Sequence, residues 1–175
     1  LDDDIIPAGG LVGAHARNYR DESVWAVSGQ VLQPDQGVLH EQPRPRGRGI
    51  WRDLNFPFNA EGRCDVFNCM AGNLSVRRAM ALAAGGFDEN FVGVSCRVET
   101  EFARRLVRLG GRVVFDSAAS IRHLRCARGG TRVHGDGLRR PGPAHSVGDY
   151  YFALREPAGT RRLRYAAARM ARSAA

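Results

Sequence analysis

The chain has 175 residues, of which 43% are hydrophobic and 25% are charged. These proportions are ordinary for a globular domain that buries a core, and no apolar run approaches the roughly 20 residues that a membrane-spanning helix needs. The formal net charge is +8, which favours anionic partners. Every basic residue is an arginine. Because lysine is absent, this segment excludes a Walker A phosphate-binding loop and a pyridoxal Schiff base.

The four cysteines show neither a C-x-x-C pair nor the spacing of a zinc site, which favours free thiols without excluding disulfides. They are Cys64, Cys69, Cys96 and Cys126. Nothing at the amino end resembles a signal peptide. We therefore expect a cytoplasmic location.

The chain begins with three consecutive carboxylates, Asp2, Asp3 and Asp4, which lie between Leu1 and a pair of isoleucines. Adjacent negative charges repel one another, so such a run either holds a cation or is fully solvated. The apolar flanks favour the first case and predict a buried strand end whose earlier part precedes Leu1. In open α/β sheets, ligands bind at the carboxyl ends of strands.

The next elements are a helix, a strand and a long irregular region. Pro7 is expected to open a helix that includes Tyr19, and the branched and aromatic residues of 24–31 predict a strand. Between 33 and 62 the periodicity falls away, and the stretch QPRPRGRG (42–49) is typical of a mobile loop. This basic loop could close over an anionic substrate or be a solvated surface loop.

Order returns in the second half of the chain. A short strand is expected to end at Val76, and a helix then runs to about Ala84, where two glycines stop it. Further extended segments are predicted at 112–117 and 119–124. The composition of 125–148, which is rich in Gly, Arg and His, indicates another loop.

The clearest helix of the sequence lies at 99–111. Its expected apolar face carries Phe102, Leu106 and Leu109, while its arginines, among them Arg104, point elsewhere. Two further helices are predicted at the carboxyl end, over 146–155 and 160–175.

Five blocks of the sequence, in this order, resemble the carboxyl-terminal half of a family 2 glycosyltransferase. The blocks are LDDDIIP (1–7), MAGNLSVRRA (70–79), GGFDENFVG (85–93), ETEFARRLVRLGGRVVF (99–115) and ASIRHL (119–124). The resemblance extends less closely to HSVGDYYFALR (145–155). It implies an α/β fold of the A-type, Rossmann-like class, present in part, with a mixed sheet flanked by helices. Residues 1–155 would be the carboxyl-terminal part of the catalytic domain, without its amino-terminal nucleotide-binding half, and 156–175 an Arg/Ala-rich terminal helix.

In such enzymes a D-x-D motif holds Mg²⁺ or Mn²⁺ against the diphosphate of a nucleotide sugar, because a departing diphosphate develops negative charge that a hard cation neutralises. The resemblance places Asp2 and Asp4 at the motif positions. Asp4 is the more direct ligand, Asp2 acts through water or the ribose, and Asp3 tunes the local field. His123 is expected at the metal or the diphosphate. The alternatives are an acidic turn without a cation and an ordinary polar histidine.

The family commonly carries Glu-Asp-x-Glu where this chain reads Val98-Glu99-Thr100-Glu101. The role of general base, which removes the proton of the acceptor hydroxyl, therefore falls on Glu99, with Glu101 as a second acid beside the substrate. Glu99 reaches one methylene further than the usual aspartate, which changes its placement. Two plainer readings remain open: acids in a first helical turn are favoured by the helix dipole, and either glutamate could pair with Arg105.

Three further segments have mixed interpretations. Gly72 and Asn73 resemble the family's segment beside the donor and acceptor sugars, where a glycine permits close backbone approach, or form a tight strand entry. The GGFDE stretch (85–89) is expected to be structural. The arginines of RCARGGTR (125–132) would suit a flap over phosphates or a solvated loop.

The resemblance implies an inverting, metal-dependent transferase that moves a sugar from a nucleotide-diphosphate sugar to a hydroxyl acceptor, either a sugar or a lipid-linked sugar, in polysaccharide or glycoconjugate synthesis. We expect the segment alone to be inactive. A metal-dependent phosphohydrolase is the second reading, although such enzymes usually employ a lysine.

A third reading takes the arginine excess as a module for nucleic acid or for an anionic membrane. Nucleic acid is the weaker partner, because the aromatic residues are not interleaved with arginines. The stretch RRLRYAAARMAR (161–172) could instead associate peripherally with the inner face of the membrane.

Overall fold

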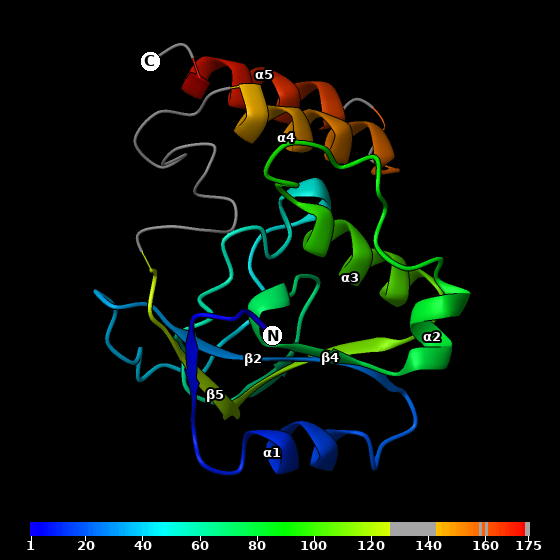
Figure 1. Ribbon diagram of the computed structural model, residues 1–175. Helices are drawn as coiled ribbons and strands as arrows, with labels where there is room; N and C mark the ends of the chain where they lie inside the picture. The colour runs from blue at the N-terminus through cyan, green and yellow to red at the C-terminus, as the bar shows by residue number, and fades with distance from the viewer. Residues whose placement is uncertain (127–142, 158, 160, 174–175) are drawn as a thin grey trace.

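The computed structural model describes residues 1–126, 143–157, 159 and 161–173, and its fold is α/β, with a mixed, curled sheet flanked by helices (Figure 1). The strands are β1 (Ile5–Pro7), β2 (Val24–Leu32), β3 (Arg63–Asp65), β4 (Leu74–Val76) and β5 (Arg112–His123). The α-helices are α1 (Leu11–Asn18), α2 (Arg78–Ala83), α3 (Val98–Arg108), α4 (Pro143–Arg155) and α5 (Arg161–Ser173). Two 3₁₀ turns, η1 (Gly49–Trp51) and η2 (Ala71–Asn73), interrupt the loops.

Strand β5 is the centre of the sheet. It pairs in parallel with β2 along one edge, and β2 pairs antiparallel with β4. Along its other edge β5 pairs antiparallel first with β3 and then with β1. A bulge separates these two partners, because the β2 register steps from Gly29 opposite Asp116 to Gln30 opposite Ser120. The two extended segments predicted at 112–117 and 119–124 are therefore the two halves of one bent strand.

The bulge requires a glycine on β2. A Cβ atom on Gly29 would lie 2.1 Å from the carbonyl oxygen of Ala119 and 2.2 Å from the Asn73 amide nitrogen. No side chain fits such a space, so the absence of a Cβ atom lets β5 and η2 approach β2.

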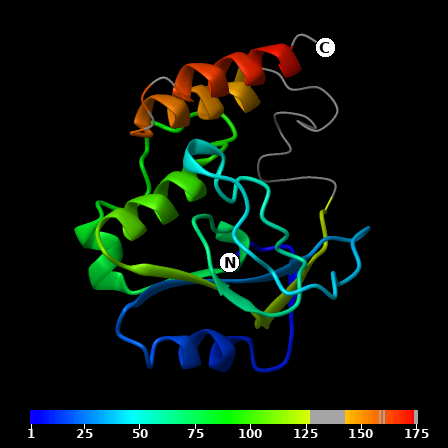
Figure 2. The same cartoon turned by 180° about the vertical axis from the view of Figure 1, so that it is seen from behind.

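Helices cover the sheet on both sides. Helix α1 lies on one face, and α3 lies on the other, with the α4–α5 pair stacked beyond it (Figures 1 and 2). Under α3 the core includes Phe56, Phe58 and Phe115, whose rings meet edge to face. Phe102 and Leu106 of α3 pack onto the same core. A second cluster joins α4 and α5 to η1 through Phe152, Tyr165 and Ile50.

Most elements predicted from the sequence are confirmed, including β2, β4, α2, α3 and the two terminal helices. Helix α1 begins at Leu11 rather than at Pro7, because Pro7 ends the edge strand β1, where its missing N–H is tolerated. The expected burial around the aspartates is wrong, since Leu1 and Ile6 are exposed. The assignment of the α3 faces is also wrong in part: Leu109 is exposed, whereas Arg104 is buried.

The irregular region needs a correction as well. The stretch 42–49 has no regular structure before Gly49, but Ile50, Leu54, Phe56 and Phe58 are buried and belong to the core. Aromatic side chains bury large apolar areas wherever they lie, so this segment is packed although it has no periodicity. Within the part of the chain that the structure describes, no helix combines the length and apolar character needed to cross a membrane.

Candidate functional site

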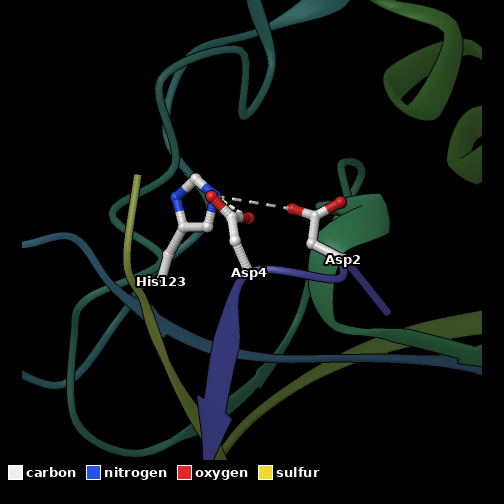
Figure 3. A group of neighbouring side chains, drawn as sticks. All are labelled: Asp2, Asp4 and His123. Atoms are coloured by element: carbon white, nitrogen blue, oxygen red, sulfur yellow. Dashed lines mark ion pairs between the residues drawn. The ribbon is translucent and has the colours of Figure 1, made fainter. Parts of the chain in front are cut away.

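Asp2, Asp4 and His123 form a cluster at one end of the sheet (Figure 3). The aspartates lead into β1, and His123 ends β5. The antiparallel pairing of Ile5 with His123 therefore brings the histidine beside the acidic run. The His123 Nε2 atom lies 3.0 Å from Asp4 Oδ1 and 3.8 Å from Asp2 Oδ2. One donor atom from each residue falls within 4.8 Å of the other two.

The orientation of the His123 ring is set by a residue that the sequence analysis missed. The Nδ1–H group of His123 donates a hydrogen bond of 2.9 Å to Gln33 Oε1, just beyond β2. In the neutral imidazole, Nε2 then carries the lone pair, and it faces two carboxylates. Three groups that can each donate an electron pair thus lie near one another, and a proton or a cation among them would be stabilised. Two carboxylates and an oriented imidazole are a fitting donor set for a divalent cation.

The three aspartates have different surroundings. Asp4 is nearly buried, with 11% of its side chain exposed, and its Oδ2 atom accepts a hydrogen bond from the Cys126 backbone N–H. Asp2 is 53% exposed. Asp3 is exposed and lies outside the cluster. Asp4 is therefore the more enclosed of the two aspartates in the cluster, and Asp2 is the more accessible to solvent.

The η2 turn lies against the cluster. The Asp2 backbone N–H donates to the Gly72 carbonyl at 3.3 Å, and a Cβ atom on Gly72 would lie 2.5 Å from Asp2 Oδ2. Gly72 is therefore the position where the backbone comes close to the acidic run. The side chain of Asn73 is fully buried, and its Nδ2 group donates to the carbonyls of Gln30 and Ala119. Its amide thus connects β2 with β5.

Glu99 lies on the other side of the same turn. It is in the first turn of α3, and its Oε1 atom accepts a hydrogen bond of 3.0 Å from the Ala71 N–H of η2. Burial raises the pKa of Glu99, and the negative charge of Asp2 raises it further, while the Ala71 hydrogen bond and the Arg97 charge lower it. Asp2 is thus close enough to act on Glu99 electrostatically. The two expected functional poles flank one 3₁₀ turn.

Glu99 lines a cavity of about 740 Å³. Its wall is formed by aromatic side chains such as Phe56 and Phe87 and by polar groups such as Asn68 and Thr100. The Thr100 hydroxyl donates to Asn68 Oδ1, which fixes both polar groups. A mainly apolar hollow with a few placed polar groups and a perturbed carboxylate has the character of a small-molecule site.

Arg97 positions the start of α3 and was also missed by the sequence analysis. It has a left-handed backbone, with φ 72°, and its side chain bonds Asp149 Oδ1 and the Leu54 carbonyl. These contacts fasten the residue before α3 to α4 and to the loop after η1. A left-handed arginine has no local sequence signal, because glycine is the usual residue there.

Glu101 is not brought to the cavity. Its carboxylate is buried and pairs with Arg105 at 2.6 Å, one turn along α3, and with Arg108 at 3.6 Å. Arg105 also donates to the carbonyls of Ala84 and Gly86. The pairing with Arg105, one of the two plainer readings, is confirmed for Glu101, which helps to fasten α3 to the end of α2.

Within the GGFDE stretch the glycines and Asp88 have the structural roles that were predicted, while Phe87 and Glu89 also line the cavity. Gly85 and Gly86 have positive φ values of 82° and 68° and end α2, and Asp88 accepts the Asn90 N–H within the turn. All four cysteines are free, as expected. Of the arginines of the predicted flap, Arg128 and Arg132 lie outside the described residues, while Arg125 lies 3.9 Å from Asp35.

Comparison with known proteins adds no assignment to this geometry. No family model matches the chain, and no curated protein matches it. Functional proposals for this site therefore depend on the chemistry of its own residues.

Proposed function

We propose that the chain is the carboxyl-terminal part of a metal-dependent, inverting family 2 glycosyltransferase with the A-type, Rossmann-like fold. It would transfer a sugar from a nucleotide-diphosphate sugar to a hydroxyl of a sugar or lipid-linked sugar. One observation carries the proposal: the η2 turn contacts Asp2 through Gly72 and Glu99 through Ala71. A donor diphosphate at the cluster and an acceptor in the cavity would then be neighbours.

In this mechanism, the acceptor hydroxyl transfers its proton to a carboxylate oxygen of Glu99 while the hydroxyl oxygen forms a bond to the anomeric carbon of the donor sugar. The bond from that carbon to the diphosphate oxygen breaks, and its electron pair leaves with the nucleoside diphosphate. The raised pKa of Glu99 makes its carboxylate a stronger proton acceptor than an exposed glutamate. Asn68 and Thr100 would orient the acceptor from the cavity wall.

Asp4 and His123 would hold the cation directly, and Asp2 would complete the site through water. When bound, Mg²⁺ or Mn²⁺ supplies positive charge to the departing diphosphate. Because an imidazole joins the carboxylates, we expect Mn²⁺ to bind more tightly than Mg²⁺. The Gln33 hydrogen bond to His123 would keep its Nε2 atom available.

The cluster is tested by titrating the chain with Mn²⁺ and measuring binding by calorimetry or electron paramagnetic resonance. Asp4→Ala should weaken binding by about tenfold or more, and Asp3→Ala, in the exposed neighbour, should leave it unchanged. Gly72→Ala should weaken binding by about tenfold, because its Cβ displaces the Asp2 carboxylate. Equal Mn²⁺ binding by all variants would remove the metal site.

The base is tested by a transfer assay on the full reading frame that encodes the chain. A panel of nucleotide-diphosphate sugars is supplied with and without Mn²⁺. Glu99→Gln should lower kcat by about 10²-fold to 10⁴-fold while Mn²⁺ binding persists. Glu89→Gln is the matched control, because Glu89 is an exposed carboxylate in the wall of the same cavity. A kcat that changes neither on removal of Mn²⁺ nor in the Glu99→Gln variant would reject the proposal.

A further inference from the structure

The α4–α5 pair presents a row of exposed apolar side chains on the outside of the molecule. Leu154 is 69% exposed, Leu163 is 68% exposed and Met170 is 55% exposed, and Val147 adds to them. We call these four residues the apolar strip. Side chains of this size are rarely left together in water unless they meet another surface.

The strip follows from how the two helices are rotated. Phe152 of α4 and Tyr165 of α5 point inward, where their rings meet within a fully buried cluster. Positions seven residues apart lie on the same side of a helix, so Val147 and Leu154 share one face of α4, and Leu163 and Met170 share one face of α5. The strip is therefore a second apolar face, in addition to the one that holds the pair onto the protein.

The exposed apolar face of α4 and the exposed apolar face of α5 meet in a groove of about 330 Å³. Leu154 and Leu163 line it together with Tyr150, Ala153 and Ala166, and Arg162 provides the charged group. The groove thus joins the two helices into one apolar surface with a cation in its wall.

The charges around the strip are positive. Helix α5 contains five arginines and no acidic residue, and Arg161, Arg162 and Arg164 are exposed. The acidic residue of α4, Asp149, is buried and bonds Arg97, and Glu156, which directly follows α4, is buried and bonds Arg104. The exposed surface of the two helices, as far as the structure describes it, therefore combines apolar side chains with cations.

We propose that the α4–α5 face docks onto an anionic membrane surface. The apolar strip would enter the boundary between headgroups and acyl chains, and the arginines would contact lipid phosphates. A nucleic acid is a poorer fit, because its phosphate backbone offers no apolar surface for the exposed leucines. A second copy of the chain, paired face to face, would bring arginines against arginines. The inference goes beyond the proposed transferase and does not depend on it.

The position of the pair suits this role. Helices α4 and α5 lie at the end of the molecule opposite α1, with α3 and the sheet between them (Figures 1 and 2). The face can therefore rest on a membrane while the sheet and the helices that cover it, α1 and α3, remain on the aqueous side. A transferase docked in this way would meet lipid-linked acceptors at the same surface.

The test is flotation of the chain with vesicles of phosphatidylcholine alone and of phosphatidylcholine mixed with phosphatidylglycerol. Binding should require phosphatidylglycerol and fall as salt is added. The double variant Leu154→Ser with Leu163→Ser should weaken vesicle binding by about thirtyfold. The double variant Arg162→Gln with Arg164→Gln should weaken vesicle binding by a similar factor when measured at low salt. Circular dichroism should show all these variants folded, because the changed residues are exposed.

Matched controls come from residues outside the α4–α5 pair. Val12→Ser with Leu82→Ser removes two exposed apolar side chains from α1 and α2, and Arg17→Gln with Arg20→Gln removes two exposed arginines near α1. Both control variants should bind vesicles as the parent chain does. Equal losses in control and strip variants would overturn the docking surface. A concentration-dependent dimer that Leu163→Ser abolishes would also overturn it, by assigning the face to a second copy.

Discussion

On the α1 face of the sheet a chain of buried contacts links amide, imidazole and hydroxyl groups, whereas on the other face ion pairs join α3 and Arg97 to the α4–α5 layer. Tyr19 donates to the Ser75 hydroxyl, which bonds His15 Nδ1, and His15 Nε2 donates to Asn73 Oδ1. The Asn73 amide group continues this chain into the carbonyls of Gln30 and Ala119. The register of β2, β5 and η2 thus depends on short hydrogen bonds without a full charge.

The helical layer on the other face is held by buried charges. The Arg104 guanidinium bonds Glu156 at 2.8 Å, and Asp149 receives Arg97, Arg169 and the Tyr165 hydroxyl. A buried ion pair loses much more when one partner is removed than an uncharged hydrogen bond does, because the remaining charge stays desolvated. The docking of α4 and α5 therefore depends on buried charges, whereas the register of β2, β5 and η2 depends on uncharged hydrogen bonds.

The largest effect is expected from Asp149→Ala, which leaves Arg97 and Arg169 without their buried carboxylate. The free energy of unfolding should fall by about 3–5 kcal/mol, measured by urea denaturation. Asp21→Ala is the control, because it removes an exposed partner of Arg112. A loss no larger than that of Asp21→Ala would show that the ionic layer does not stabilise the fold.

A smaller loss is expected from Asn73→Ala on the other face. The variant leaves the carbonyls of Gln30 and Ala119 and the His15 N–H without partners, at a cost of about 2–3 kcal/mol in the same measurement. Added salt should change this loss little, because no full charge is removed. Asn90→Ala, in an exposed turn, provides the baseline.

The pH dependence of Glu99 gives a third, weaker effect. Burial and the Asp2 charge raise the pKa of Glu99 above the unfolded value near 4.5, so the folded state binds the proton more tightly. This contribution to stability is complete below the unfolded pKa and is lost as the pH rises through the folded pKa. Glu99→Gln should therefore raise Tm at pH 7 relative to its effect at pH 4. Equal changes at both pH values would contradict the assigned shift.

The last prediction changes the protein least and concerns the rate of chemical labelling at Cys69, which lies in the core beside the first turn of α3. Its thiol donates to the Glu99 carbonyl at 3.3 Å, and burial raises its pKa well above the ordinary value. Iodoacetamide should modify it about a hundredfold more slowly than the exposed Cys126, as followed by mass spectrometry. In the Asp149→Ala variant the rate of iodoacetamide labelling at Cys69 should rise, because the ionic contacts that hold the start of α3 are lost. A rate at Cys69 equal to that at Cys126 in the parent chain would contradict the packing of α3 onto the core.

Local patterns in the sequence determined most of the elements. The β-branched run of β2, the glycines after α2 and the apolar spacing of α3 each act within a few residues, so they could be interpreted without the fold. The acidic run and Glu99 stood out for the same reason, because their chemistry is carried by neighbouring residue types.

The tertiary structure alone decided which of these groups meet and which are already used. Glu99 and Glu101 are two residues apart, yet one lines the cavity and the other is taken by Arg105. The partners of Arg104 and His123 lie 52 and 90 positions away. Neither periodicity nor residue type reports such distant pairings, because burial and charge compensation arise only when the elements pack together.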